Sequence, residues 1–185
     1  MKKNYFISSF VLVAVGFFAA LATADDDRDL LVRFNGGIGV NPVSSGVGTA
    51  ATATTVNRNI VRNIQPPGQI WVIRDLDARI KTNGDIKVDG QGLTLGGGNS
   101  IGRTTGQSVF ATLICEAAAP FTEHSTTAAG VLLAPNGDFK IDDVLVPLPP
   151  ATCASPMLLI RTAGSGNWFA AGIPVTLGNS AHGDD

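Results

Sequence analysis

The sequence contains two histidines, His124 and His182, and an imidazole is the usual general base of a serine hydrolase. His124 stands in the run Thr-Glu-His-Ser-Thr, beside hydroxyl groups and the carboxylate of Glu123, whereas His182 lies close to the end of the chain. Neighbours in sequence do not make the geometry of a catalytic triad. We interpret His124 as a solvated loop histidine, keep a secreted hydrolase using carboxylates or His124 as the alternative, and assign no catalytic residue.

Paired carboxylates are a second possible source of hydrolytic chemistry, because glycoside hydrolases place two of them around the scissile bond. The candidate residues are Asp75, Asp77, Glu116 and Glu123. Positions on strand faces and in loops explain these acids equally well.

Calcium is a further possibility, because hard cations prefer clustered oxygen ligands. Five aspartates recur in two similar segments: Asp85, Asp89, Asp138, Asp142 and Asp143. The twelve-residue spacing of an EF-hand is missing, and Asp is common after Asn-Gly in turns. The sequence therefore predicts no metal site and no cofactor.

Residues 97–104, GGNSIGRT, nearly match the phosphate-binding pattern G-x-x-x-x-G-K-[ST], with Arg103 in place of the lysine. Such a loop needs a following helix whose N-terminus faces the phosphates. The residues after Ser108 are β-branched and apolar and predict a strand instead. We interpret the segment as a flexible loop between strands.

Cys115 and Cys153 are the two cysteines, and an even number in an exported chain predicts a disulfide. The alternative, a zinc pair, lacks further cysteines or a histidine beside either residue. A bridge would close a loop of 38 residues, and the loop-entropy model gives it about 4 kcal/mol before strain.

An internal repeat contains the five aspartates considered for calcium. Residues 80–95 contain Asn-Gly-Asp followed by alternating apolar and charged positions, and residues 136–148 repeat the pattern 53 positions later. Asn-Gly tolerates the positive φ angles of a type I′ turn. The sequence predicts two hairpins of one design.

Short strands recur between turn signals along most of the chain, at the spacing of sandwiches and barrels, and no window shows helical periodicity. We expect strands at residues 70–80 (with a bulge near Arg74-Asp75), 86–95, 108–116, 131–133, 138–147, 157–161 and 167–174. The predicted fold is an all-β antiparallel sandwich or barrel over residues 70–176. Residues 25–69 are expected to form a Gly/Ser/Thr-rich N-terminal arm or loose strands, and residues 177–185 a frayed tail.

The first 24 residues have the pattern of a secretory signal peptide: Lys2-Lys3, an apolar run, and Ala22-Thr23-Ala24. Its removal leaves 11 basic against 15 acidic residues, a net charge of −4, with the basic residues scattered singly. That distribution does not predict a nucleic-acid partner. The apolar run is too short to span a bilayer, so no membrane span is expected after cleavage.

The phrases GQIWVIRDL, GQSVFATLIC, NGDF-I-D and LLIR…WFAAGIP, which begin at Gly68, Gly106, Asn136 and Leu158, resemble a family of small secreted bacterial proteins of no assigned activity. The resemblance covers nearly the whole chain after the predicted leader. It implies a bacterial secreted origin and carries no catalytic residue or ligand with it.

The leading hypothesis is an exported, non-enzymatic β domain that acts through surface contacts with a protein, envelope component or glycan. The partner, the oligomeric state and the choice between periplasm and medium stay open.

Cleavage after Ala24 predicts that protein from the native host begins at Asp25. Mass spectrometry of the intact chain and its N-terminal peptide measures this directly. An intact Met1 in a cytosolic fraction would contradict both the leader and the compartment.

Overall fold

The computed structural model describes residues 29–45 and 55–175, and every regular element within those ranges is a β-strand. The strands are β1 (Leu30–Gly39), β2 (Val43–Ser45), β3 (Val56–Arg58), β4 (Trp71–Val72), β5 (Asp75–Lys81), β6 (Asp85–Gln91), β7 (Thr94–Leu95), β8 (Ser108–Ile114), β9 (His124–Ser125), β10 (Val131–Leu132), β11 (Phe139–Val144), β12 (Met157–Thr162) and β13 (Trp168–Val175). The predicted all-β class is confirmed. The predicted leader and tail lie outside the described residues.

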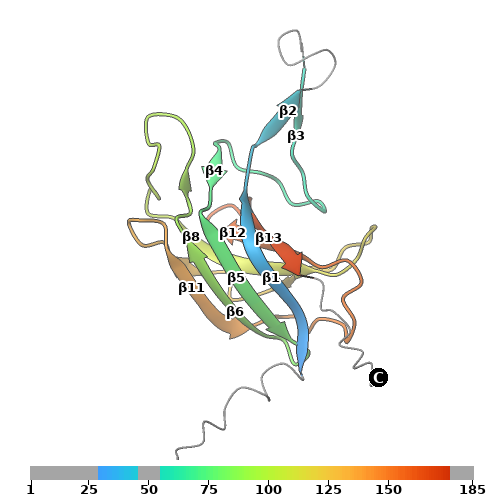
Figure 1. Ribbon diagram of the computed structural model, residues 1–185. Helices are drawn as coiled ribbons and strands as arrows, with labels where there is room; N and C mark the ends of the chain where they lie inside the picture. The colour runs from blue at the N-terminus through green and yellow to red at the C-terminus, as the bar shows by residue number, and fades with distance from the viewer. Residues whose placement is uncertain (1–28, 46–54, 176–185) are drawn as a thin grey trace, which may run out of the picture.

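Nine strands form one antiparallel sheet that curls into a nearly closed barrel (Figure 1). Their order is β10-β8-β12-β13-β1-β5-β6-β11, with β9 paired to β8. The chain just beyond β11 bridges the two ends, because Ser125 and Val146 exchange backbone hydrogen bonds of 3.0 and 2.9 Å. Of the two architectures predicted, the structure is barrel-like.

Alternating side chains explain why β5 and β6 are strands with one buried face. The inward-facing residues are fully or almost fully buried: Leu76, Ala78 and Ile80 on β5, and Ile86 and Val88 on β6. Burying a large apolar side chain stabilises a fold by roughly 1.5–3 kcal/mol. The outward positions between them are charged, so the same two strands build both the core and an exposed charged surface.

The first described strand, β1, falls in the range expected to form an N-terminal arm or loose strands. It lies in the middle of the main sheet, between β13 and β5, and Phe34 is completely buried. The glycines that suggested looseness allow close packing, since a Cβ on Gly37 would lie 2.8 Å from the Ile73 side chain. The core therefore begins near Leu30, while β2 and β3 project from the barrel as a separate pair (Figure 1).

Residues 57–64, for which the sequence allowed a helical turn or a strand, contain the end of β3 and then a tight two-residue turn. Arg62 and Asn63 both have positive φ, 47° and 69°, and Val61 and Ile64 exchange backbone hydrogen bonds around them. Two successive positive φ angles are the signature of a type I′ turn.

The two long strands predicted at 70–80 and 86–95 are each divided. Instead of a bulge near Arg74-Asp75, the chain leaves the main sheet, and β4 pairs with β7 in a separate two-stranded sheet. The close approach of β1 explains the change, because Gly39 lies against the backbone of Trp71 and a Cβ there would be 2.3 Å from the Trp71 carbonyl oxygen.

The two Asn-Gly turns have the same local chemistry. In each turn the Asn side chain accepts from the amide of the Asp two residues later, Asp85 and Asp138 respectively, and donates to its carboxylate. The type I′ prediction is wrong, since only the glycines, Gly84 (φ 86°) and Gly137 (φ 85°), have positive φ. This pattern is that of a type I turn followed by a left-handed glycine.

The two copies of the repeat pair with each other. β6 and β11 run antiparallel in continuous register, with Val88 opposite Ile141, which are equivalent positions of the repeat. A local pseudo-two-fold axis therefore passes through this pair. The second hairpin predicted from the repeat does not form, because β10 pairs with β8 and leaves β11 to β6.

The predicted disulfide is confirmed. Cys115 and Cys153 are bonded, with Cα atoms 4.7 Å apart. The Arg62 guanidinium lies beside the bridge and donates to the carbonyl oxygens of Ile114 and Ser155, both at 2.8 Å. The bridge and this arginine together connect the start of β12 to the end of β8.

The two turn glycines give a matched test of the packing. Gly137→Ala places a Cβ 2.5 Å from the Leu93 amide nitrogen, whereas Gly84→Ala meets only the end of the Leu148 side chain, at 2.9 Å. The left-handed conformation costs both variants about 1–2 kcal/mol. We expect Gly137→Ala to lose at least twice as much unfolding free energy as Gly84→Ala in denaturant titrations. Equal losses would contradict the backbone contact.

Reduction of the disulfide should lower the unfolding free energy by at most about 4 kcal/mol, because it frees a loop of 38 residues in the unfolded chain. Denaturant midpoints with and without reductant measure the loss, and the Cys115→Ala/Cys153→Ala double variant serves as the control that reductant cannot affect. Identical midpoints would mean that the fold does not depend on the bridge.

Candidate functional site: a charged face on β5, β6 and β11

His124 is not the solvated loop histidine that the sequence suggested. It lies in β9 with 4% of its surface exposed, and its Nδ1 is 2.8 Å from the carbonyl oxygen of Pro147. A carbonyl can only accept, so Nδ1 donates, while the buried Nε2 contacts no hydrogen-bond partner in the described part of the chain. The neighbouring Ser125 hydroxyl bonds Thr112, at 2.9 Å, instead of the imidazole. The arrangement suits a structural histidine at the seam of the barrel, the place where β9 bonds the chain that follows β11.

The carboxylates near His124 are held by structural donors. Glu123 pairs with Arg161, whose side chain is only 13% exposed. Glu116 accepts from the Thr122 amide at 3.2 Å, and this bond lowers the pKa of Glu116. A general acid at neutral pH needs a raised pKa, so Glu116 does not fit that role.

The glycine-rich loop 97–104 also contains the pattern G-x-S-x-G, at Gly98-Asn99-Ser100-Ile101-Gly102, which sequence reasoning passed over. Two of its amides are used in backbone hydrogen bonds: Gly102 N–H donates to the Leu95 carbonyl and Arg103 N–H to that of Ser100. A strand, β8, follows the loop where either a nucleophile elbow or a phosphate-binding loop requires a helix. The loop is a compact connection between strands.

The five aspartates considered for calcium have other partners. Asp85 and Asp138 bond the turn asparagines, Asp89 pairs with Lys140, and Asp142 with Lys87. Asp143 accepts from the Thr127 and Val144 amides, both at 2.8 Å. Within residues 29–45 and 55–175 no group of three or more His, Cys, Asp or Glu side chains is arranged to hold a metal ion.

The side chains that do gather lie on the outer surface of the barrel. We call this surface the charged face and define it by the outward residues of β5, β6 and β11: Asp77, Arg79, Lys81, Asp85, Lys87, Asp89, Lys140 and Asp142. Three adjoining hollows cover it, the first with a volume of about 500 Å³. The first and second hollows share Arg79, Lys87 and Asp142, and the second and third share Asp89 and Lys140. We call this series of neighbouring hollows along β6 and β11 the trough.

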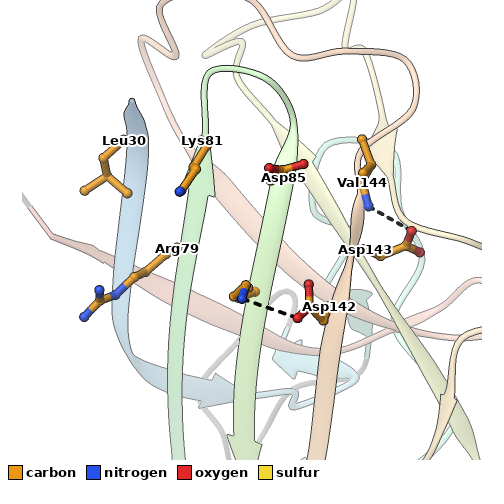
Figure 2. A pocket seen from close by; sticks show the side chains of 8 residues that line it. Leu30, Arg79, Lys81, Asp85, Asp142, Asp143 and Val144 are labelled. Carbon is orange, nitrogen blue, oxygen red and sulfur yellow. Dashed lines mark hydrogen bonds and ion pairs between the residues drawn. The ribbon is translucent and has the colours of Figure 1, made fainter. Parts of the chain in front are cut away.

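The pseudo-two-fold axis organises the charges between β6 and β11. Lys87 pairs with Asp142 at 3.4 Å, and the equivalent pair on the other side of the axis is Lys140 with Asp89. Figure 2 shows Asp142 of the first pair, with Asp85 on the neighbouring strand and Asp143 next to it in the chain. The hydrogen bond and the charge of Asp89 raise the pKa of Lys140.

Between β5 and β6 the charges are arranged differently. Arg79 lies directly opposite Lys87, and Asp77 lies directly opposite Asp89. Arg33 of β1 extends the first row, because it is in register with Arg79. Like charges in opposite cross-strand positions destabilise a sheet. Like charges therefore face each other across β5 and β6, while on β11 Asp142 and Lys140 carry the opposite sign at the same two levels.

Comparison with known proteins identifies no relative: no family model, no curated protein and no solved structure matches this chain. The resemblance to small secreted bacterial proteins stays a prediction. Among the described residues no helix is long and apolar enough to cross a membrane.

Sequence reasoning listed the acids of this face one by one as turn, hairpin or metal candidates and missed the surface. A signal for it was present, since each repeat carries Lys between two Asp at two-residue spacing: Asp85-Lys87-Asp89 and Asp138-Lys140-Asp142. Alternation puts such a triplet on one face of a strand. The sequence alone does not show that the two triplets lie on adjacent strands.

The pH dependence of stability tests the two hydrogen bonds that Asp143, beside the charged face, accepts from backbone amides. The bonds from Thr127 and Val144 lower the pKa of its carboxylate, so its contribution is present above the unfolded value near 4 and is lost as pH falls through the folded pKa. Asp143→Asn should lower the unfolding free energy at pH 7 by about 0.5–1 kcal/mol, the low end for a largely exposed site. The gap to the parent should narrow as pH falls below the unfolded pKa and through the lowered pKa of the folded carboxylate. A gap that is constant over this range would contradict the assignment.

Proposed function

We propose that this chain is an exported, non-enzymatic binding domain that contacts its partner through the charged face. The observation that carries the proposal is the trough along β6 and β11, whose walls come from both copies of the repeat. Binding sites are typically concave and placed on a rigid scaffold. Here the scaffold is the barrel itself.

The exposure of this trough favours recognition of a macromolecule. The Lys87, Asp142 and Lys140 side chains are between 75% and 81% exposed, so they meet a partner with little rearrangement of the fold. Mixed charges at the surface favour specific orientation and fast encounter over tight burial. A bacterial origin and a location in the periplasm or medium are part of this proposal, supported by the disulfide, which is typical of oxidising compartments.

A hydrolase is the second candidate, and the geometry gives it less support. His124 is buried on a backbone carbonyl, and Glu123 is committed to Arg161. Broad hydrolase assays on the parent and on His124→Ala, Glu116→Ala and Glu123→Ala test it. Turnover by the parent that disappears in a variant would overturn the binding proposal.

Site-specific photo-crosslinking in the producing cells tests the binding proposal. A photoreactive residue at Lys140 should give a discrete adduct, whereas the same residue at Thr152, exposed in the loop before β12, should not. Circular dichroism of both purified proteins checks that the fold is kept. Equal adducts at the two positions, or none at Lys140, would contradict a specific partner on this face.

A further inference from the structure

The end of the barrel that carries β4 and β7 presents exposed apolar side chains. Ile70, just before β4, is 42% exposed, and Val72 on β4 is 45% exposed. Both side chains lie over Gly96, since a Cβ on that glycine would be 2.9 Å from each of them. Ile101, in the loop that follows β7, is 64% exposed.

Backbone hydrogen bonds hold this loop against the small β4–β7 sheet. The Gly96 amide donates to the Ile70 carbonyl oxygen and the Gly102 amide to that of Leu95, both at 2.8 Å. Ile101 therefore precedes a residue that is fixed to β7, and the three apolar side chains belong to one surface. We define the end patch as Ile70, Val72, Ile101 and Arg103.

The loop after β7 has open space beside it. A Cβ added to Gly97, Gly102 or Gly106 would meet nothing within 4 Å in the described part of the chain. The strands β2 and β3 project from the same end (Figure 1), and Val56 on β3 is 64% exposed. Contiguous exposed apolar residues on a folded domain mark an interaction site.

This end also differs in charge from the rest of the chain. Residues 36–74 and 92–115 contain four arginines and no Asp or Glu, although the whole chain has 15 acidic and 13 basic residues. Arg58 and Arg62 donate to backbone carbonyls, and Arg74 pairs with Asp138 at 3.7 Å. Among residues 29–45 and 55–175 the Arg103 guanidinium has no partner, so its charge is available at the surface.

We propose that the end patch rests on an anionic lipid surface, with its aliphatic side chains entering the headgroup region and Arg103 binding lipid phosphate. Peripheral binding of this kind combines the burial of apolar side chains with attraction to anionic lipids. The end patch shares no residue with the charged face, so the inference goes beyond the proposed function. A protein held in this way keeps the charged face available to a partner.

A lipid surface suits the end patch better than a protein does. Three aliphatic side chains and one arginine are few beside the roughly 20–30 residues that each side of a standard protein interface uses. The patch also lacks an aromatic anchor, because Trp71 is 4% exposed and stacks on Phe169. A second copy of this chain would bring an identical cation at Arg103. A bilayer requires neither shape complementarity nor an anchor and supplies the opposite charge.

The test measures co-sedimentation of the secreted protein with lipid vesicles, after mass spectrometry has confirmed that the apolar leader is absent. One set of vesicles contains phosphatidylglycerol and phosphatidylcholine in equal parts, and the other contains phosphatidylcholine alone. We expect binding to the anionic vesicles to be at least about tenfold tighter and to weaken with added salt. Equal binding to both sets, or binding to neither, would overturn the inference.

Matched variants assign the binding to the end patch. Ile101→Ser should weaken binding to anionic vesicles at least about tenfold, because the apolar burial is lost. Val146→Ser, which shortens a 70% exposed side chain near the barrel seam, should leave it unchanged. Equal effects of the two variants would contradict the end patch.

The charge of the patch is tested in the same way. Arg103→Gln should weaken binding about fivefold, which corresponds to roughly 1 kcal/mol for one basic residue near an anionic surface. Thr152→Asp makes the same change in net charge in the loop before β12, and should leave binding unchanged. Its position is remote, because β12 begins opposite Ile114, at the far end of β8 from the loop that carries Arg103.

A polarity-sensitive fluorescent amino acid locates the contact. In place of Ile101 its emission should shift to the blue when anionic vesicles are added, and in place of Thr152 it should not. Circular dichroism checks that each protein keeps its fold. A shift at both positions, or at neither, would contradict insertion of the loop.

Two further results would assign the patch to another occupant. If glycerol phosphate releases the protein from vesicles and sodium chloride of equal ionic strength does not, the patch binds a soluble phosphate. If Ile101→Ser changes the oligomeric state in sedimentation velocity, the patch is an interface between copies of the chain. Either result overturns the lipid inference and leaves the proposal for the charged face standing.

Discussion

The antiparallel pairing of β6 with β11 is the constraint on which the rest of the structure depends. It joins two segments 53 residues apart in one register, with Val88 opposite Ile141. The carbonyl oxygen of each turn glycine then accepts a hydrogen bond from the other copy of the repeat. Leu145 N–H donates to Gly84 and Leu93 N–H to Gly137, both at 2.9 Å. Leu93 and Leu145 are buried by this arrangement, so the pairing supplies backbone bonds and core packing together.

The same pairing determines how the barrel closes. Because β11 is held against β6, the chain leaving it passes β9 at the position where Val146 and Ser125 bond. His124, next to Ser125, then bonds Pro147 from inside the seam. The opposite side of the barrel depends on β1, where Gly37 and Gly39 let the strand approach Ile73 and Trp71 closely. The Trp71 ring in turn stacks on Phe169 at 4.0 Å.

Local patterns in the sequence were sufficient for part of this structure. Alternation over 75–81 and 85–91 gave the strands, their faces and the turn at Asn83-Gly84, and the two cysteines gave the bridge. Non-local contacts decided the rest. Nothing local in Asn35-Gly36-Gly37 reveals that Phe34 is a core residue, and nothing in 138–144 states whether its partner is the preceding strand or the distant repeat. The burial of His124 has the same origin, since it depends on where the chain after β11 passes.

The symmetry of the repeat also explains the pairing of opposite charges between β6 and β11. Each copy has Lys one position before its central apolar residue and Asp one position after it, so antiparallel pairing about that centre necessarily places Lys opposite Asp on both sides. Charge complementarity between β6 and β11 is thus a consequence of the repeat. β5 lies outside the repeat and is under no such constraint, yet its Asp77 and Arg79 stand in the order that opposes like charges. Asp77 pairs instead with Arg33 and Arg79, so the ion pairs of β5 run to β1 and along the strand rather than to β6.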